Sequence, residues 1–332
     1  MKRSGAVGGI LVIVGIVVWW SLAPSWLDFL TAVAVAKGLV VLGVVLLIRA
    51  GLVSFGQGLF FAVGAYAVGF AGKWWSMHDA LALAGLGLAA GIVVSLAIGL
   101  LVARYREIFF AMLTLAFSMM LYGGLVKGYG ATGGSEGMPI TPPTLLGRPF
   151  SSDTELFFFT LACASFMIVM ALLYARSPLG YAAQAIRSNE IRVGYLGASV
   201  TKIVLATFIL AGAASGLGGA LDAMLVGHID PDLTYWTTSG EFVFVALLSG
   251  TGSVVAPLVG TVIFEIVRSY ALRWFPDFWQ IALGGVLLAV VLFLPGGLWS
   301  LHERVLEYAR RFARGNGSAL EQAPARTRRQ EL

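Results

Sequence analysis

The sequence predicts an all-α protein, a polytopic bundle of transmembrane helices with about eight crossings and one broken or re-entrant segment. Three observations lead to this fold class. Of the 332 residues, 58% are hydrophobic and only 12% are charged, about half the charge density of a soluble domain. The apolar residues gather in runs of about 20, the length that a helix needs to cross a hydrocarbon core of ~30 Å. Most Lys and Arg residues stand between these runs, as they do in the loops of membrane proteins.

Nine apolar runs are candidate membrane segments. In chain order they cover residues 6–23, 27–49, 52–71, 80–103, 108–126, 155–175, 203–226, 241–267 and 279–299. The first follows a basic end, as a secretory signal does, but it is longer than a usual signal core and Pro24 follows the obvious cleavage point. We therefore expect residues 6–23 to form a membrane helix.

The run 241–267 is the one that we expect to be broken. Gly250, Thr251, Gly252 and Ser253 interrupt it, and Pro257 follows. Its halves, of about 9 and 14 residues at about 1.5 Å each, are too short to cross. With a re-entrant hairpin here, sixteen basic residues lie inside and five outside, whereas a full crossing gives eleven and ten. The bias of basic residues toward the cytoplasm favours the hairpin, with both termini cytoplasmic and a kinked full crossing as the alternative.

The chain divides into a transmembrane domain, residues 1–301, and a basic tail, residues 302–332. The tail carries seven arginines, so we expect it to be disordered in the cytoplasm, where it can touch anionic lipid. Residues 177–202 form a long polar interruption that cannot lie in hydrocarbon. The distribution of basic residues puts this segment on the cytoplasmic side.

Five motifs resemble the permease subunits of branched-chain amino acid ABC importers, of the LivM type. They are "SFGQGLFFAVGAY" at 54–66, "REIFFAMLTLAFSMML" at 106–121, "TGGSEGM" at 132–138, "SPLGYAAQAIRSNEIRVGYLG" at 177–197 and "GGLWSL" at 296–301. The resemblance spans most of residues 27–301. Lys37 departs from the family pattern.

The resemblance implies a transport subunit without catalysis of its own. Its implied partners are two separate ABC ATPase subunits, a second permease of a different chain, a periplasmic or surface binding protein and membrane lipid, but no nucleic acid. Its implied place is the bacterial cytoplasmic membrane, and its solutes are branched-chain amino acids or related small polar solutes such as amides or urea. The chain contains no GxxxxGK[ST] phosphate loop, and we expect no cofactor.

The resemblance also implies that residues 177–202 dock on the ATPase. The residues that match the family pattern there are Gly180, Ala185, Ile186, Arg187, Asn189, Glu190, Leu196 and Gly197. The alternative is a solvated amphipathic connector.

Glycine-interrupted stretches in both halves of the chain indicate a solute path, because broken helices expose backbone groups at membrane depth. We expect this path to be lined by Ser54, Gln57, Thr114, Thr251 and Ser253, with Phe60, Phe61 and Phe110 as apolar walls. Close helix packing is the alternative.

The segment "TGGSEGM" lies in a predicted outer loop, residues 127–154. Gly133, Gly134 and Ser135 could offer backbone N–H groups to a carboxylate, and Glu136 could accept an ammonium group. A glycine-rich turn that caps helix ends is an equal alternative.

Other functional classes have weaker support. An ion-gradient-driven amino acid carrier would use Lys37 and Glu265 as its charged site, whereas a membrane enzyme has no clustered acid, base or metal motif. The single cysteine, Cys163, cannot form an internal disulfide, and the three histidines have no metal-ligand spacing. We therefore predict no metal site.

Overall fold

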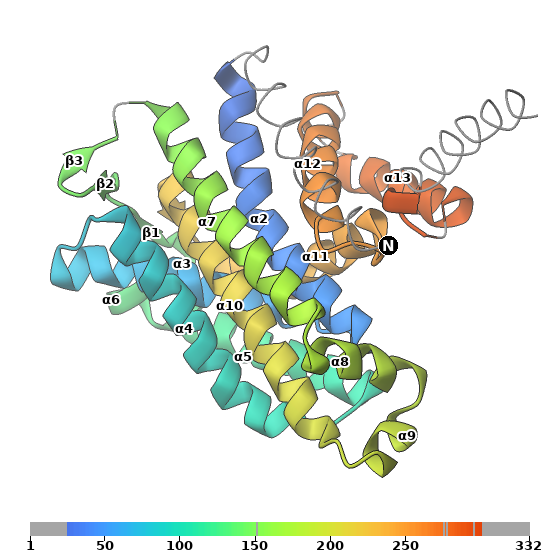
Figure 1. Ribbon diagram of the computed structural model, residues 1–332. Coiled ribbons are helices and arrows are strands. Elements are labelled where there is room, and N and C mark those ends of the chain that lie inside the picture. The colour runs from blue at the N-terminus through green and yellow to red at the C-terminus, as the bar shows by residue number, and fades with distance from the viewer. Residues whose placement is uncertain (1–24, 151, 275, 277, 295, 301–332) are drawn as a thin grey trace, which may run out of the picture.

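The computed structural model describes residues 25–300 except residues 151, 275, 277 and 295. The predicted first crossing, 6–23, and the tail, 302–332, lie outside these residues. The described part is a helical bundle with very little sheet (Figure 1). Its α-helices are α2 (Ser25–Arg49), α3 (Gln57–Trp75), α4 (Ala80–Val102), α5 (Glu107–Lys127), α6 (Tyr129–Thr132), α7 (Asp153–Ala175), α8 (Pro178–Ser188), α9 (Glu190–Tyr195), α10 (Val200–Val226), α11 (Trp236–Ser249), α12 (Ala256–Trp274) and α13 (Trp279–Phe293).

The membrane-spanning character follows from helix length and composition. Five of the described helices, α2, α4, α5, α7 and α10, are long and apolar enough to cross a membrane. These agree with the predicted runs, so the helical membrane bundle is confirmed. The total of eight crossings stays a prediction.

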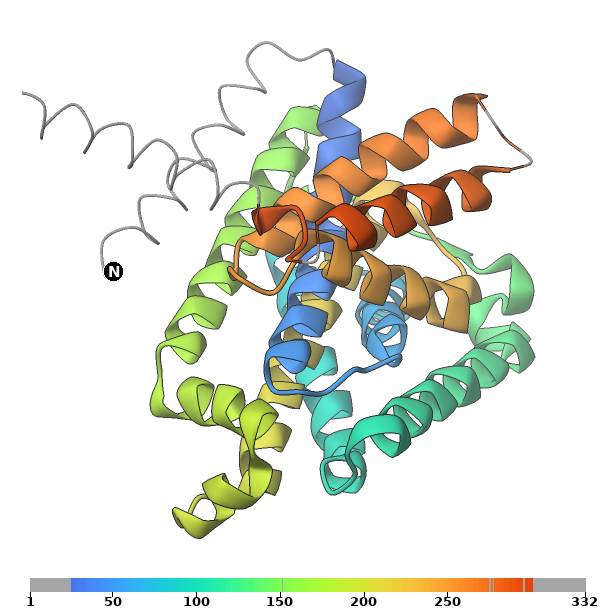
Figure 2. The same cartoon turned by 90° about the vertical axis from the view of Figure 1, so that its right-hand side faces the viewer.

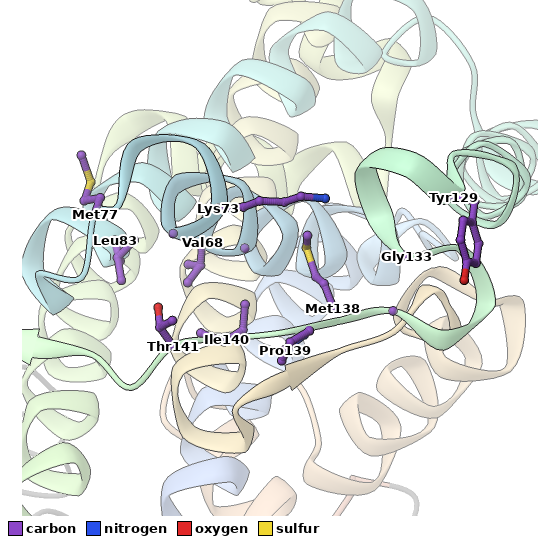
Figure 3. Close-up of a pocket in the computed structure, with 13 residues that line it drawn as sticks. Val68, Lys73, Met77, Leu83, Tyr129, Gly133, Met138, Pro139, Ile140 and Thr141 are labelled. Carbon is purple, nitrogen blue, oxygen red and sulfur yellow. The ribbon is translucent and has the colours of Figure 1, made fainter.

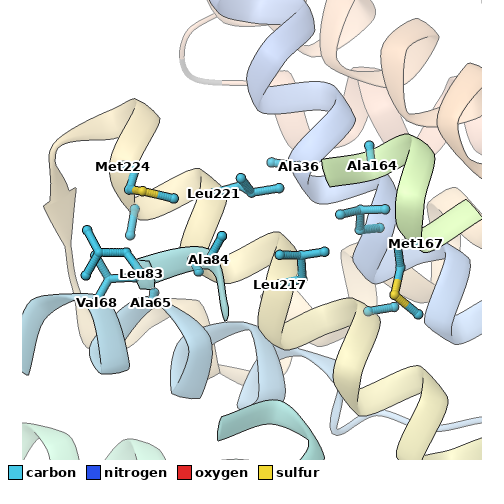
Figure 4. Packing of buried hydrophobic residues seen from close by; sticks show 14 of the residues in the cluster. Ala36, Ala65, Val68, Leu83, Ala84, Ala164, Met167, Leu217, Leu221 and Met224 are labelled. Atoms are coloured by element: carbon cyan, nitrogen blue, oxygen red, sulfur yellow. The ribbon is translucent and has the colours of Figure 1, made fainter. Parts of the chain in front are cut away.

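Helix α10 forms the centre of the bundle and packs against α2, α3, α4 and α7 (Figures 1 and 4). Helices α2 and α10 are mostly buried, while α4, α5 and α7 turn most of their residues outward. Figure 4 shows Leu217 and Leu221 of α10 among side chains from the surrounding helices. Glycines let the backbones approach closely: a Cβ on Gly216 would lie 2.5 Å from the Gly87 carbonyl oxygen and 2.8 Å from the Gly91 Cα. Small residues serve this purpose in membrane helices generally.

The predicted run 52–71 is displaced, because α3 begins only at Gln57. Residues 50–56 form a turn and an extended link: Gly51 has φ +81, and the Gly56 N–H donates to the Ser54 hydroxyl. Such side-chain to backbone bonds compete with helix. An apolar-run criterion cannot detect this, since the link itself is largely apolar.

The predicted break within 241–267 is confirmed, since α11 ends at Ser249 and α12 begins at Ala256. The two helices pack antiparallel: a Cβ on Gly260 would lie 2.9 Å from the Ser249 Cα, and Arg268 pairs with Glu241 further along both helices. Figure 2 shows α12 running back alongside α11. The segment is therefore a helical hairpin and not one kinked helix.

The halves of this hairpin are longer than predicted. They have 14 and 19 residues, because the helices continue through polar positions such as Glu241 and Arg268, which pair with each other. The argument that each half is too short to cross therefore holds for α11 only.

Outside the helices, the described part of the chain has four strands of two residues each and the 3₁₀ turns η1 (Gly134–Glu136) and η2 (Pro231–Thr234). Strand β1 (Met138–Pro139) pairs with β4 (His228–Ile229), and β2 (Thr144–Leu145) pairs with β3 (Arg148–Pro149), both antiparallel. The β1–β4 pair ties the predicted outer loop to the segment that follows α10.

Candidate functional site

Five buried polar side chains, four hydroxyls and one amide, surround the amino-terminal end of α3. We call these residues, Ser54, Gln57, Thr114, Ser215 and Ser239, the hydroxyl junction. The Ser215 hydroxyl donates to Gln57 Oε1 at 2.6 Å, the Phe55 N–H donates to Thr114 Oγ1 at 3.2 Å and the Gly58 N–H donates to Ser239 Oγ at 3.2 Å. The junction joins α3, α5, α10 and α11.

The chemistry of the hydroxyl junction favours a negative group. The first turn of a helix carries a partial positive charge on its free N–H groups. In this structure the hydroxyls accept hydrogen bonds from the amides at this end, while Gln57 Nε2 is buried without a hydrogen-bond partner among the described residues. The amide nitrogen of Gln57 is thus an unused donor next to a helix amino terminus.

The predicted aromatic walls are interior side chains. The rings of Phe60 and Phe110 both pack edge-on against Phe208, and Phe61 packs against Phe242. All three predicted phenylalanines are fully buried. Phe60 and Phe61 follow Gln57 by three and four residues on α3, so both lie about one turn from the hydroxyl junction.

The structure brings together most, but not all, of the predicted path residues. Ser54, Gln57 and Thr114 meet within the hydroxyl junction. Thr251 and Ser253 lie at the other end of α11 from Ser239, in the turn of the hairpin. There the Val255 N–H donates to Ser253 Oγ.

Sequence reasoning missed Ser215 and Ser239. Each is a small polar residue beside glycine, Ser215 in "GAASGLGG" and Ser239 before Gly240. In a membrane helix such residues face other helices, and that signal could have identified them.

A charge network connects α2, α11 and α12. Lys37 Nζ lies 2.8 Å from Glu265 Oε1, and Arg268 Nη1 lies 2.7 Å from Glu241 Oε1 and 3.7 Å from Glu265 Oε1. The Arg268 guanidinium also lies 5.3 Å from the centre of the Trp279 ring on α13. Lys37 therefore has a partner, as a lysine deep in a membrane segment requires.

The outer loop makes tight turns with glycine. Gly133, Gly134 and Gly137 all have positive φ, between +63 and +77. Their N–H groups donate to Tyr129 O, Thr132 Oγ1 and Gly134 O within the loop, which favours the turn interpretation for these glycines. The side chains of Ser135 and Glu136 are exposed.

A cavity of about 390 Å³ lies between this loop and α3 (Figure 3). It is lined mainly by apolar groups, including Val68, Met138 and Ile140. Lys73 reaches toward the loop and donates to the carbonyl oxygens of Gly130 and Ala131.

Helices α8 and α9 lie together at one end of the bundle, away from the strands (Figure 1). Ser177 caps α8 by accepting from the Gly180 N–H, and Asn189 caps α9 by accepting from the Arg192 N–H at 2.9 Å. The caps place two helix starts only twelve residues apart, which forces the chain to bend between them.

The predicted coupling residues divide into three groups. Gly180 and Ile186 are buried against the bundle. Glu190 forms an ion pair with Arg106, which precedes α5, at 3.0 Å. The others are exposed; they are Ala185, Arg187, Asn189, Leu196 and Gly197.

Helix α9 and the residue after it also expose large apolar side chains, of which only Leu196 was among the predicted coupling residues. Ile191 is 71% exposed, Tyr195 88% and the adjoining Leu196 82%. Val193 is the buried residue of this short helix. We call Ile191, Tyr195 and Leu196 the apolar tip. In "EIRVGYL" three of four large apolar residues face outward, which no periodicity of a helix this short could reveal.

The family model for the permease component of the branched-chain amino acid transport system matches residues 26–291. The high-affinity branched-chain amino acid transport system permease protein LivM of Salmonella typhimurium is 30% identical over 275 residues, 75% of this chain and 64% of the relative. The corresponding Escherichia coli protein is 28% identical over 294 residues, 80% of this chain and 68% of the relative.

A more distant relative is the galactose/methyl galactoside import permease protein MglC of Haemophilus influenzae. It is 24% identical over 222 residues, 61% of this chain and 64% of the relative. This chain thus spans about two thirds of the length of the curated relatives that it matches. No solved structure matches it significantly.

Proposed function

The chain belongs to the family of branched-chain amino acid transport permeases, and on this premise we propose that it is the membrane-spanning subunit of an ABC importer. Its solutes are branched-chain amino acids or related small polar molecules such as amides or urea. It works in the bacterial cytoplasmic membrane with two ATPase subunits, a second permease and a substrate-binding protein. Both of its termini are cytoplasmic, and the energy comes from the ATPases.

The observation that carries this proposal is the apolar tip. Three large apolar side chains, two on the short helix α9 and one directly after it, are exposed at the end of the bundle. A surface of this kind, surrounded by polar residues, is typical of a protein interface. It occurs in the segment where the family resemblance implies that the ATPase docks.

Contacts of α9 offer a mechanical path from the ATPase to the hydroxyl junction. Glu190 holds Arg106, and Arg106 also donates to the Ala103 carbonyl oxygen at the end of α4. Helix α5 begins at the next residue and carries Thr114, which accepts from the Phe55 N–H. A rigid-body movement of α9 would thus be passed to α5 and from there to the start of α3.

The hydroxyl junction is the closed constriction of the solute path in this proposal. Its hydroxyls occupy the amides at the start of α3, where a solute carboxylate would otherwise accept hydrogen bonds. When α5 moves, Thr114 withdraws and the amide of Phe55 becomes free. The unused Gln57 Nε2 supports recognition of a carboxylate or an amide oxygen at this level.

The alternative is a carrier driven by an ion gradient, and the Lys37–Glu265 pair is the feature that favours it. At membrane depth, one member of a buried ion pair can release the other and bind a transported ion in its place. The two proposals differ in their energy source.

Reconstitution tests both. The chain is co-expressed with its partner ATPases, partner permease and binding protein, placed in liposomes and supplied with radiolabelled leucine, isoleucine or urea. We expect uptake with enclosed ATP and none with a proton or sodium gradient alone. Uptake driven by a gradient without the ATPase subunits would establish the carrier and overturn the importer.

A further inference from the structure

The cavity between the outer loop and α3 has the dimensions of a small-molecule site. Its volume of about 390 Å³ lies within the range of about 300–1,000 Å³ that is usual for ligand pockets. It is about thirteen times the ~30 Å³ that one water molecule occupies in the liquid. A molecule of about eight to twelve non-hydrogen atoms therefore fits inside it.

Two walls enclose this cavity, as Figure 3 shows. Helix α3 provides one wall, with Val68 and Lys73, and the outer-loop segment 137–141 provides the other. Met77 lies toward one end of the cavity and Tyr129 toward the other. The Lys73 side chain runs along the cavity toward the Tyr129 end, so the charged part of the lining lies at that end.

The loop wall is fixed by its own backbone contacts. Strand β1 within it pairs with β4, and beyond this pair the Ile140 N–H donates to the Gly227 carbonyl oxygen at 2.9 Å. Beside the cavity the loop also touches α3, since a Cβ on Gly69 would lie 2.5 Å from the Met138 sulfur. The space is therefore largely preformed, as small-molecule sites usually are.

Lys73 is the one charged side chain among the described residues that line the cavity. Its Nζ donates to the carbonyl oxygens of Gly130 and Ala131 at 3.2 and 2.9 Å. An ammonium group has three N–H donors, so one donor is left. Within the described part of the chain, Lys73 forms no ion pair with a carboxylate. Its positive charge is therefore available to an anion from outside the chain.

The rest of the lining suits a hydrocarbon. Val68, Met138 and Ile140 present aliphatic or thioether groups, and the Thr141 hydroxyl is already paired with His78 Nδ1 at 2.9 Å. No carboxylate lines the cavity in the described part of the chain. The ammonium group of an amino acid would have no charge partner here and would lie near the positive charge of Lys73. The lining thus favours a ligand with one negative group and no amino group.

We propose that this cavity binds a monocarboxylate with an apolar body of about five to nine carbon atoms. The carboxylate accepts the remaining N–H of Lys73 in a charge-assisted hydrogen bond, and the hydrocarbon lies along Val68, Met138 and Ile140. The site is separate from the hydroxyl junction, because Gln57 and Lys73 lie toward opposite ends of α3. Its existence does not rest on the proposed transport function.

Thermal unfolding of the purified full chain tests the site. Lipid nanodiscs hold the protein, because a detergent is itself an amphiphile, and reaction of a thiol dye with Cys163, the single cysteine, reports unfolding. The probes are sodium 4-methylpentanoate, octanoate and hexadecanoate, with the neutral 4-methylpentanamide and the cationic 4-methylpentylamine as matched controls. At ten times its dissociation constant the bound short acid is expected to raise Tm by about 3–6 °C.

Variants decide whether the shift belongs to this cavity. Lys73→Met removes the charge and should abolish the shift, whereas Lys127→Met removes an exposed lysine at the end of α5, outside the cavity, and should retain it. Gly72→Leu should also abolish the shift, because it fills the cavity with a side chain. A Cβ there would meet only Thr141 Oγ1, at 3.4 Å. This variant keeps Lys73 and decides the matter if Lys73→Met does not fold.

The outcomes are distinct. A shift with 4-methylpentanoate or octanoate that both cavity variants remove supports the site. A shift with hexadecanoate alone would overturn the short acid and assign the site to a fatty acid of the membrane. No shift with any acid, an equal shift with the amide or the amine, or an undiminished shift in both variants would overturn the site itself. The melting assay needs no transport, so a lack of ATP-driven leucine uptake would overturn the proposed function and leave this result standing.

Discussion

Replacing Gly216 with alanine should separate α10 from α4 and destabilise the bundle. The added Cβ would lie 2.5 Å from the Gly87 carbonyl oxygen, 2.8 Å from the Gly91 Cα and 3.1 Å from the Gly91 nitrogen. Ordinary contact begins at 3.4 Å, so α4 would have to move by about 0.9 Å, the difference between 3.4 and 2.5 Å. All three contacts are with backbone, and no side chain can turn away to relieve them.

The magnitude follows from the cost of overpacking. Adding a methyl group to a closely packed interior costs about 1–3 kcal/mol. At about 2–4 °C per kcal/mol for a chain of this size, a middle value of about 2 kcal/mol lowers Tm by about 4–8 °C. Alanine also favours helix over glycine by about 1 kcal/mol, which acts in the opposite direction.

Gly85→Ala is the matched control. Gly85 lies on α4 itself, and a Cβ there would meet nothing within 4 Å. The gain in helix propensity is common to both variants, so the difference between their Tm values measures overpacking alone. Melting of the purified protein, followed by labelling of Cys163, provides both values. Equal Tm values within about 1 °C would refute the claim that close backbone contact holds α10 and α4 together.

Three further predictions concern charged groups. Lys37→Met should lower the free energy of unfolding by about 3–5 kcal/mol, because it leaves the buried Glu265 without its 2.8 Å partner. Lys37→Met combined with Glu265→Leu should recover most of the loss in Tm. An additive loss in the double variant would contradict the pairing. Hydrogen bonds from the N–H groups of Ala82, Leu146 and Leu81 hold the pKa of Asp79 below 3.8. The Asp79 carboxylate therefore stabilises the folded chain fully above its unfolded pKa near 4. This stabilisation is lost as the pH falls through the lower pKa of the folded state. Tm measured from pH 6 to pH 3 should therefore fall more in the wild type than in Asp79→Ala, and parallel curves would exclude this role. Glu190→Arg should lower ATP-driven leucine uptake while Tm changes by less than about 4 °C, since an exposed ion pair contributes at most about 1 kcal/mol to the free energy of unfolding. Adding Arg106→Glu should restore uptake. Unchanged uptake in the single variant would argue against coupling through this pair.

The membrane-length helices were predictable because the thickness of the hydrocarbon core sets the length of an apolar helix that crosses it. A run such as 80–103 must form a helix in hydrocarbon, where every backbone group needs an internal partner, and the structure has α4 at Ala80–Val102. The break at Gly250 was predictable for a related reason, since its φ of +87 suits glycine and few other residues.

The hydroxyl junction was predictable only in part. Ser54 and Gln57 were identified through a motif, but their partner Ser215 is 158 positions from Gln57 in the chain. No local pattern encodes contact across such a separation. The charge network shows the same limit: Lys37 and Glu265 were expected as one charged site of the alternative carrier, but Arg268 and Glu241 joined them only when the hairpin folded back on itself.

The sequence by itself determined that this chain is a helical membrane protein and where most of its membrane-length helices begin and end. These properties depend on transfer of each segment from water to lipid, which is a local free energy. Only the tertiary structure decided between the predicted hairpin and a kinked crossing for α11 and α12, and only it showed that Ile191, Tyr195 and Leu196 face outward. These depend on which helix surfaces meet, because burial and pairing are properties of two segments and not of one.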